Sequence, residues 1–300
     1  MPSAQSDVDV ELLAESPRIA AGIASSLLPV RRGGPDGDLP QRRVMVTDVE
    51  QDVERYAAYH RVCGLTQRDQ VPATWLHVLT FPLQVHLMAA ADFPLGLAGL
   101  VHVTNQMELR RPVLVGESLT LSSSAADLRP HRSGTQVDLL GEARVGDEVV
   151  WTGRSTYLAR GRQPSGAAST EGGPVLPETV EEAVQTSQSI AVSALWRLPA
   201  GLGRQYAAVA GDVNPIHLSA VTAKLFGFPR AIAHGMWAHA RALGALEGRL
   251  PEAYEVSAAF RKPVLLPSTV GFGFAPADDA LAFRLTDRAG EKVHLEGSVR

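Results

Sequence analysis

The segment LRRPVLVGESLTL (Leu109–Leu121) returns 151 residues later as FRKPVLLPSTVGF (Phe260–Phe272). A shorter match has the same order along the chain: Tyr-Ala-Ala begins at Tyr56 and again at Tyr206, 150 residues further on. Both offsets are close to half of the 300-residue chain. A shared period of this size indicates a duplicated unit. We therefore expect two copies of one fold in tandem.

Each copy shows helical segments first and strands afterwards, an order that is typical of the α+β class. Partial alternation of apolar and polar residues, interrupted by turn sequences, indicates strands of an antiparallel meander. The last helix before the strands of the second copy, 234–248, is rich in Gly and Ala. Small side chains would allow a curved sheet to wrap closely around this helix. The same composition is equally compatible with an ordinary Ala-rich core helix. The predicted strands cover 100–110, 117–128, 135–145 and 148–159 in the first copy, and 254–262, 268–275, 280–287 and 292–300 in the second.

A segment of linker composition separates the copies. Residues 161–182 read GRQPSGAASTEGGPVLPETVEE, which is rich in Gly, Pro, Ser and acidic residues. We expect an N-terminal unit over 1–160, a linker over 161–187 and a C-terminal unit over 188–300.

Composition narrows the class of protein. A hydrophobic content of 45% with 20% charged residues suits a globular chain, and a net charge of −4 gives no reason to expect nucleic-acid binding. The lone Cys63 excludes an intramolecular disulfide and fits a reducing, cytoplasmic compartment, where it is expected to be a buried apolar residue. The apolar segment 19–30 follows acidic residues and is too short to span a bilayer, so we expect a packed N-terminal helix, no secretion signal and no membrane segment.

The segment GDVNPIH (211–217) combines a carboxylate, a helix-start signal and an imidazole. Asn is a preferred N-cap, and Pro is favoured at the first helical position. Asn214 and Pro215 therefore predict a helix start, with His217 in the first turn and Asp212 just before the cap. The two side chains can then meet at the mouth of the helix. Because the positive helix end disfavours a protonated imidazole, we expect His217 to be a neutral general base.

The alternative to a functional site is a capped helix that carries a surface histidine. At an offset of 150 residues, Asp212 and Asn214 match Val62 and Gly64 of the first copy. A cap that the fold itself requires would be present in both copies. The polar set occurs once, so we interpret it as functional.

A second feature follows at AIAHGMW (231–237). Gly235 is expected at the start of the apolar helix, where its N–H has no acceptor within the helix. Such an N–H at a positive helix end can bind a developing oxyanion. The alternative is that Gly235 only permits close packing.

These residues resemble a known family. YAAVAGDVNPIH (206–217), with Ala223 and HGM (234–236) downstream, resembles the hydratase-2 signature of MaoC-like (R)-specific enoyl-thioester hydratases and dehydratases. The whole chain is similar to the actinobacterial MaoC-like (3R)-hydroxyacyl-thioester dehydratases associated with long-chain fatty-acid elongation. The stretches that carry this likeness are LTFPLQVHLM, RRPVLVGE, GDVNPIH, AKLFGFPRAIAHGM and FRKPVLLP.

The resemblance implies a double hotdog, two units that each wrap a curved antiparallel sheet around a long helix. It places the family's acid/base pair on Asp212 and His217, its orienting Asn on Asn214 and its oxyanion donor on the backbone N–H of Gly235. It also implies that the first unit is not catalytic and accommodates the acyl tail. The implied substrate is a thioester of CoA or of acyl-carrier protein, in fatty-acid elongation or degradation, without metal or other cofactor.

Four cations occupy matching places in the two copies. Arg110 and Arg111 correspond to Arg261 and Lys262. They are either solvated charges at strand ends or contacts to the phosphates of CoA or of an acyl-carrier pantetheine. Among them, Arg261 and Lys262 lie in the copy that carries the polar set and are the candidate substrate-binding residues.

Other signals argue against other activities. His234 and His239 are five residues apart, off the spacing for two metal ligands on one helix face. GLGRQY (201–206) lacks the third glycine of a nucleotide loop, and no G-x-S-x-G occurs. The alternatives left open are a hotdog thioesterase and a non-catalytic acyl-thioester binding subunit. A duplicated chain can act alone or as a homodimer.

Overall fold

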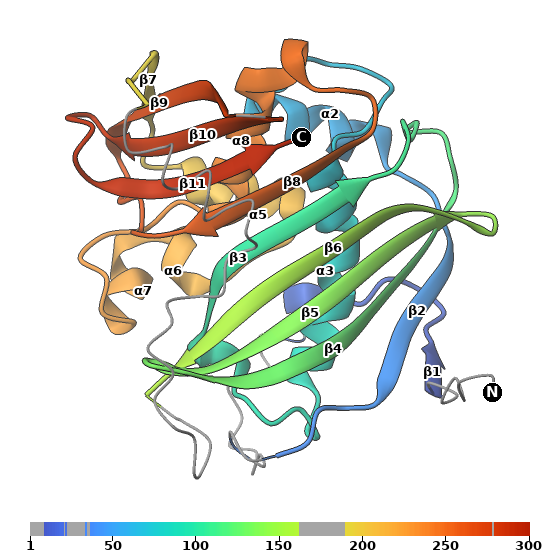
Figure 1. The fold of residues 1–300 in the computed structure, drawn as a ribbon. Coiled ribbons are helices and arrows are strands. Elements are labelled where there is room, and N and C mark those ends of the chain that lie inside the picture. Colours follow the sequence, from blue (N-terminus) through green and yellow to red (C-terminus); the bar gives the residue numbers. More distant parts are fainter. Residues whose placement is uncertain (1–8, 21, 23–33, 35–36, 162–189, 278) are drawn as a thin grey trace.

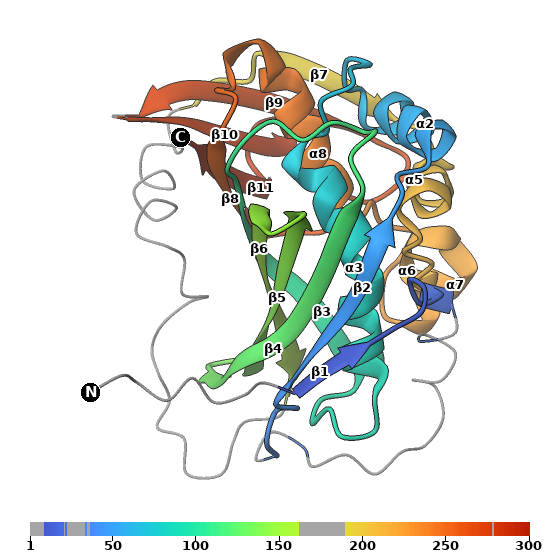
Figure 2. The ribbon, with the colours of Figure 1, turned by 90° about the vertical axis from the view of Figure 1, so that its right-hand side faces the viewer.

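Two buried helices lie at the centre of the protein. The computed structural model describes residues 9–20, 22, 34, 37–161, 190–277 and 279–300. Helix α3 (Ala73–Ala89) buries 14 of its 17 residues, and α8 (Gly235–Leu246) buries eight of its 12. A helix with buried residues on all sides belongs in a core. Figure 2 shows both helices inside the curve of a sheet.

Eleven strands of the described residues form that sheet, in the order β1-β2-β4-β5-β6-β3-β8-β11-β10-β9-β7 (Figure 1). Strands β3 and β8 pair antiparallel and join the two copies at the centre. The predicted α+β class, with a curved antiparallel sheet around a long helix in each copy, is confirmed. The strands are β1 (Asp9–Leu12), β2 (Arg42–Val49), β3 (Leu100–Leu109), β4 (Leu119–His131), β5 (Gly134–Val145), β6 (Glu148–Arg160), β7 (Ala194–Leu198), β8 (Tyr254–Phe260), β9 (Ser268–Ala277), β10 (Ala280–Asp287) and β11 (Val293–Val299).

The strand prediction was incomplete in two respects. It missed β1, β2 and β7, which come before the helices of their copies. Strands β1 and β7 have only four and five residues, and β2 begins with two Arg residues, so their local pattern is weak. The predicted meander was also wrong for the first of its four strands. That strand pairs with the last one, β3 with β6 and β8 with β11. This pairing brings β3 and β8 to the inner edges, where the copies meet.

The two copies differ most between their helices. In the first copy, α2 (Val53–Cys63) is joined to α3 by nine residues, 64–72. In the second, α5 (Leu202–Ala210) is joined to α8 by 24 residues, 211–234. The longer connection contains the short helices α6 (Pro215–Leu218) and α7 (Ala220–Leu225). The predicted polar set therefore lies in a segment that only the second copy has.

Several predictions fall on other parts of the chain. Nearly all of the predicted linker 161–187, and most of the predicted helix 19–30, lie outside the described residues, so the unit boundaries stay predictions. Cys63 is buried, as expected, and burial raises the pKa of its thiol. None of the helices in the described ranges is long and apolar enough to cross a membrane.

Candidate active site

The site begins where α5 ends. Gly211 follows the helix with φ of 81°, and its N–H donates to Ala207 O at 2.8 Å. This left-handed conformation is favourable only for glycine. A Cβ atom at Gly211 would also lie 2.8 Å from Ile19 Cδ1. Gly211 thus turns the chain out of α5 and places Asp212 at the start of the long connection.

The next residues form the predicted helix start. Asn214 is the N-cap of α6, and its Oδ1 accepts the Ile216 N–H at 3.3 Å. Pro215 is the first helical residue, and His217 is the third, as expected. Asp212 Oδ1 accepts the Asn214 N–H at 3.1 Å. These bonds hold the carboxylate and the imidazole in one compact turn.

His217 is oriented by a backbone carbonyl. Its Nδ1–H donates to Ile232 O at 2.8 Å, which leaves Nε2 as the hydrogen-bond acceptor. Burial lowers the pKa of His217, while Asp212 and the bond to Ile232 act in the opposite direction. The expected neutral base is therefore supported, but the expected cause was wrong. Helix α6 has only four residues and cannot supply a substantial dipole, so burial takes that role.

The structure adds His234 to the site. Its Nε2–H donates to Asp212 O at 3.0 Å and lies 3.7 Å from Asp212 Oδ2. Its ring stacks on that of His217 with centroids 3.6 Å apart and planes 25° apart. Burial first, and then His217, lowers the pKa of His234 to about 3. His234 was expected to have no role as a metal ligand and was given no other role, although its place directly before Gly235 in HGM was a usable signal.

Gly203 has a part that the sequence analysis also missed. A Cβ atom at Gly203, in α5, would lie 2.0 Å from the carbonyl oxygen of His217. Only glycine allows α5 and α6 to approach this closely. Gly203 of GLGRQY therefore serves the position of His217, which is consistent with the rejection of a nucleotide loop.

Gly235 lies where it was expected. It is the first residue of α8, so its N–H has no acceptor within the helix. A Cβ atom there would lie 2.9 Å from the ring of Phe260. His234 before it is extended, with φ −66° and ψ 139°. Gly235 thus offers a free N–H at the helix start and also permits close packing, so both expected roles are compatible with the structure.

Asp212, His217 and His234 are also the residues that could hold a metal ion. A carboxylate oxygen of Asp212 and one nitrogen of each ring lie within 4.8 Å of one another. Stacked rings direct their lone pairs side by side and not to a common point, which is unfavourable for coordination. The spacing suits a bridging water molecule better than a metal ion. One water that bonds two groups at about 2.8 Å and a near-tetrahedral angle spans about 4.6 Å.

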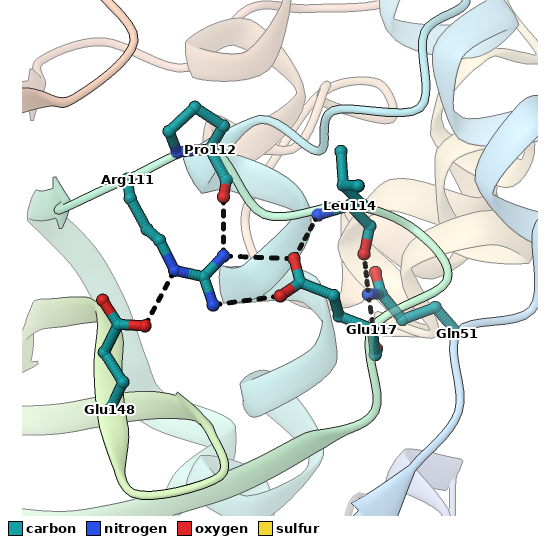
Figure 3. Close-up of polar contacts among 6 residues, drawn as sticks. All are labelled: Gln51, Arg111, Pro112, Leu114, Glu117 and Glu148. Atoms are coloured by element: carbon teal, nitrogen blue, oxygen red, sulfur yellow. Dashed lines mark hydrogen bonds and ion pairs between the residues drawn. The ribbon is translucent and has the colours of Figure 1, made fainter.

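The cations of the first copy are engaged in structural contacts. Figure 3 shows Arg111 between two carboxylates: its Nη2 donates to Glu117 at 2.9 Å, and its Nε donates to Glu148 at 2.9 Å. Glu117 also accepts the Leu114 N–H at 2.7 Å, and Pro112 O accepts from Arg111 Nη1 at 2.7 Å. Arg111 therefore stabilises the turn between β3 and β4; it lies after a strand end, but it is paired with carboxylates and is not the solvated charge of the first alternative.

The two candidate cations of the second copy differ from each other. Arg261 pairs with Glu296, whose side chain is 8% exposed, much as Arg110 pairs with Glu108. Lys262 is exposed and takes part in no ion pair within the described part of the chain. The structure thus gives Arg261 a stabilising partner and leaves Lys262 able to reach a ligand.

Lys262 lies close to the site along the backbone. Val264 O accepts the Ala233 N–H at 2.9 Å. The segment after Lys262 therefore runs beside the one that leads into His234 and Gly235.

A continuous sheet built from two tandem units, each wrapped around a buried helix, defines the double hotdog class. Among the described residues of this chain, the acid–imidazole site lies in the long connection between the helices of the second unit.

Comparisons with known proteins agree with this class. A model of the MaoC like domain matches residues 176–296. The chain is 38% identical over 262 residues to 3-hydroxyacyl-thioester dehydratase X of Mycobacterium tuberculosis, which covers 87% of this chain and 90% of that protein. The crystal structure of HtdX from Mycobacterium tuberculosis superposes with a TM-score of 0.73 at 36% identity, over 86% of this chain and 99% of that one. A MaoC-like dehydratase from Phytophthora capsici shares the fold at 16% identity, with a TM-score of 0.68 over 86% of this chain and 93% of that one.

The chain belongs to the MaoC-like family.

Proposed function

We propose that this protein is a hydro-lyase that reversibly dehydrates (3R)-3-hydroxyacyl thioesters to trans-2-enoyl thioesters. The observation that carries the proposal is the Asp212–His217 pair, in which Ile232 O holds one ring nitrogen and leaves Nε2 as an acceptor. The name of the relative that is 38% identical, a 3-hydroxyacyl-thioester dehydratase, supports the same reaction.

In the hydration direction, Asp212 and His217 hold one water between them. His217 Nε2 accepts a proton from that water as its oxygen bonds to C3 of the enoyl thioester. The C2=C3 double bond opens, and C2 takes up a proton from the pair. The sum is addition of H and OH across one double bond, and dehydration is the reverse. Positioned acid–base chemistry of this kind is worth about 10²–10⁴ in rate.

The backbone at α8 stabilises the intermediate charge. As C2 becomes nucleophilic, negative charge develops on the thioester oxygen. The Gly235 N–H is free to donate to that oxygen, and it lies next to His234 in the site. Loss of one such donor costs about 10²–10³ in kcat.

The reaction requires no electron transfer and no Lewis acid beyond this N–H, so the proposed enzyme uses no metal or other cofactor. The carrier is CoA or acyl-carrier protein, the compartment is the cytoplasm, and the assembly is a single chain or a homodimer. The lone Cys63 and the duplicated unit support the last two points.

The assay that tests the proposal follows short to long trans-2-enoyl-CoA substrates by loss of the conjugated enoyl absorbance, with the product configuration determined. We expect (3R)-3-hydroxyacyl-CoA. Release of free CoA thiol with no hydroxyacyl product would indicate a thioesterase. Tight binding without turnover would indicate a binding subunit.

The role of Gly235 is separable from its packing by two substitutions. Gly235→Ala keeps the N–H and adds a Cβ against Phe260, whereas Gly235→Pro adds a similar Cβ and removes the N–H. Proline is accepted at a first helical position after an extended residue such as His234. We expect kcat of the Pro variant to lie about 10²–10³ below that of the Ala variant. Equal kcat in the two variants would remove Gly235 as the oxyanion donor.

Lys262 is the cation to test for phosphate recognition. Arg261→Glu would place a second carboxylate beside Glu296 and change stability, so Lys262→Gln is the cleaner substitution. We expect KM for CoA thioesters to rise about fivefold at unchanged kcat, because an exposed charge contact is worth about 1 kcal/mol. Lys292→Gln, at another exposed lysine, is the matched control. The same KM in both variants would exclude Lys262 from binding.

A further inference from the structure

A group of polar side chains lies buried between the two units. His77 and Gln84 come from one face of α3, seven residues apart, and are 3% and 0% exposed. Tyr157 on β6 and His239 on α8 are buried as well, and His102 on β3 is partly buried. We call these five residues the interior polar cluster.

Ring contacts connect the cluster. The His102 ring lies 6.0 Å from that of His77 and 4.6 Å from that of Tyr157, and both pairs are stacked. Tyr157 Oη is 3.5 Å from Gln84 Oε1. His77 acts electrostatically on the pKa of His239, and His239 acts on that of His102. The five side chains therefore surround one region of the interior.

Many polar atoms of the cluster have no partner. His77 Nδ1, His102 Nε2, Gln84 Nε2 and both ring nitrogens of His239 are buried without a hydrogen bond to any described residue. A buried polar group left unpaired costs about 1–3 kcal/mol. Buried polar groups in proteins are otherwise almost always bonded. A concentration of unpaired buried atoms requires an explanation, and a polar guest that bonds them is one.

The histidines suit a guest that both donates and accepts. Burial lowers the pKa of His77 to about 4 and that of His239 to about 3, and it also lowers the pKa of His102. All three are neutral imidazoles at neutral pH, each with one N–H donor and one acceptor nitrogen.

The cluster adjoins the proposed active site on its buried side. The Phe260 ring lies 2.9 Å from where a Cβ atom on Gly235 would be, and it lies 4.9 Å from the ring of His102. Asp212 acts electrostatically on the pKa of His77. The carrier end of a thioester held at Gly235 must lead to solvent. The buried side is therefore left for the acyl chain.

We propose that the interior polar cluster binds a hydroxyl or keto group on the acyl chain beyond C3, so that the enzyme selects oxygenated acyl thioesters over hydrocarbon ones. This inference rests on the proposed dehydratase function. A plain chain would place methylene groups against the unpaired nitrogens and displace any water that bonds them. An oxygenated chain supplies those bonds itself. Discrimination of this type is strong because the unfavoured substrate leaves polar groups unpaired.

The experiment compares matched trans-2-enoyl-CoA substrates of equal length, with and without a hydroxyl or keto group at C5 or C7. We expect kcat/KM of wild type to favour an oxygenated member about 10- to 100-fold, as expected for one or two recovered hydrogen bonds. His77→Leu and Gln84→Leu should each remove most of that preference, by lowering kcat/KM for the oxygenated substrate and raising it for the plain one. His86→Leu is the matched control, since His86 lies on the same helix and contacts Glu11 near the surface.

The midpoint of urea unfolding, measured for each variant, shows whether a change in activity reflects a change in stability. Because His77→Leu removes a buried ring with an unpaired nitrogen, its midpoint should equal or exceed that of wild type. Gln84→Leu also removes the acceptor of Tyr157 Oη, so its midpoint is expected to fall, and its rates are compared on folded protein. Equal wild-type rates on both members of every pair would mean that the cluster holds water only, and would overturn the inference while leaving the dehydratase function intact. If the variants lost kcat/KM equally on the oxygenated and the plain substrate, the inference would also be overturned. No hydration of any enoyl thioester would instead contradict the proposed function itself.

Discussion

Asp212→Asn is expected to lower kcat for enoyl-thioester hydration by about 10²–10⁴. The asparagine Oδ1 can still accept the Asn214 N–H, so the turn that carries the site is retained. What is lost is the negative charge that helps to hold and polarise the water. The measurement is kcat from the disappearance of enoyl absorbance at saturating substrate.

The control for Asp212→Asn is Asp147→Asn, the same chemical change at an exposed turn between β5 and β6. It should leave kcat unchanged. A kcat near that of wild type for Asp212→Asn, in a folded protein, would exclude Asp212 from the chemistry.

His217→Asn is expected to have an effect of similar size. The asparagine Nδ2 can replace Nδ1 as the donor to Ile232 O, so only the Nε2 acceptor is removed. His294→Asn is a closely matched control: His294 is also 8% exposed, and its Nδ1 donates to a backbone oxygen, that of Lys262, at 3.0 Å. The control should retain kcat. Equal losses in both variants would show that burial of the ring matters and its basicity does not.

The pH dependence provides a second readout for His217. A general base works in its neutral form, and burial lowers the pKa of His217 below the ordinary value of 6.5. The midpoint of the loss of activity that depends on His217 should therefore lie below pH 6.5. A midpoint above pH 6.5 would indicate a different base, or a His217 whose pKa is raised.

The strands that the sequence predicted are those whose signal is local. Predicted segments such as 280–287 agree with the observed strands because apolar alternation and flanking turn residues both mark them. The strand order was not predictable in the same way. The pairing of β3 with β6 and with β8 depends on contacts between segments distant in the chain, which no local pattern reveals.

In the site, too, features with a local sequence signal were predictable and contacts between distant residues were not. Asn214 and Pro215 define a helix start by local chemistry alone, which is why Asp212 and His217 were found together. His234 reaches Asp212 O from 22 residues away. Gly203 is required only because another helix crosses it.

The neutrality of His217 was predicted for the wrong reason. Local sequence shows that a helix begins at Asn214, but not that the helix ends after one turn. It also does not show how deeply the ring is buried. The repeat matched Arg111 with Lys262 and suggested that the two cations have the same role. Glu117, which binds Arg111 in the first unit, corresponds to Ser268 in the second unit, so Lys262 has no equivalent acidic partner at that position.

The most direct test of the account is the kcat of the double variant Asp212→Asn/His217→Asn beside its two single variants. If an anionic and an uncharged side chain activate the same water, removing either one disables the unit, and the double variant should be no slower than the worse single one. If the two losses multiply in full, the residues act independently, and the shared-water mechanism is contradicted.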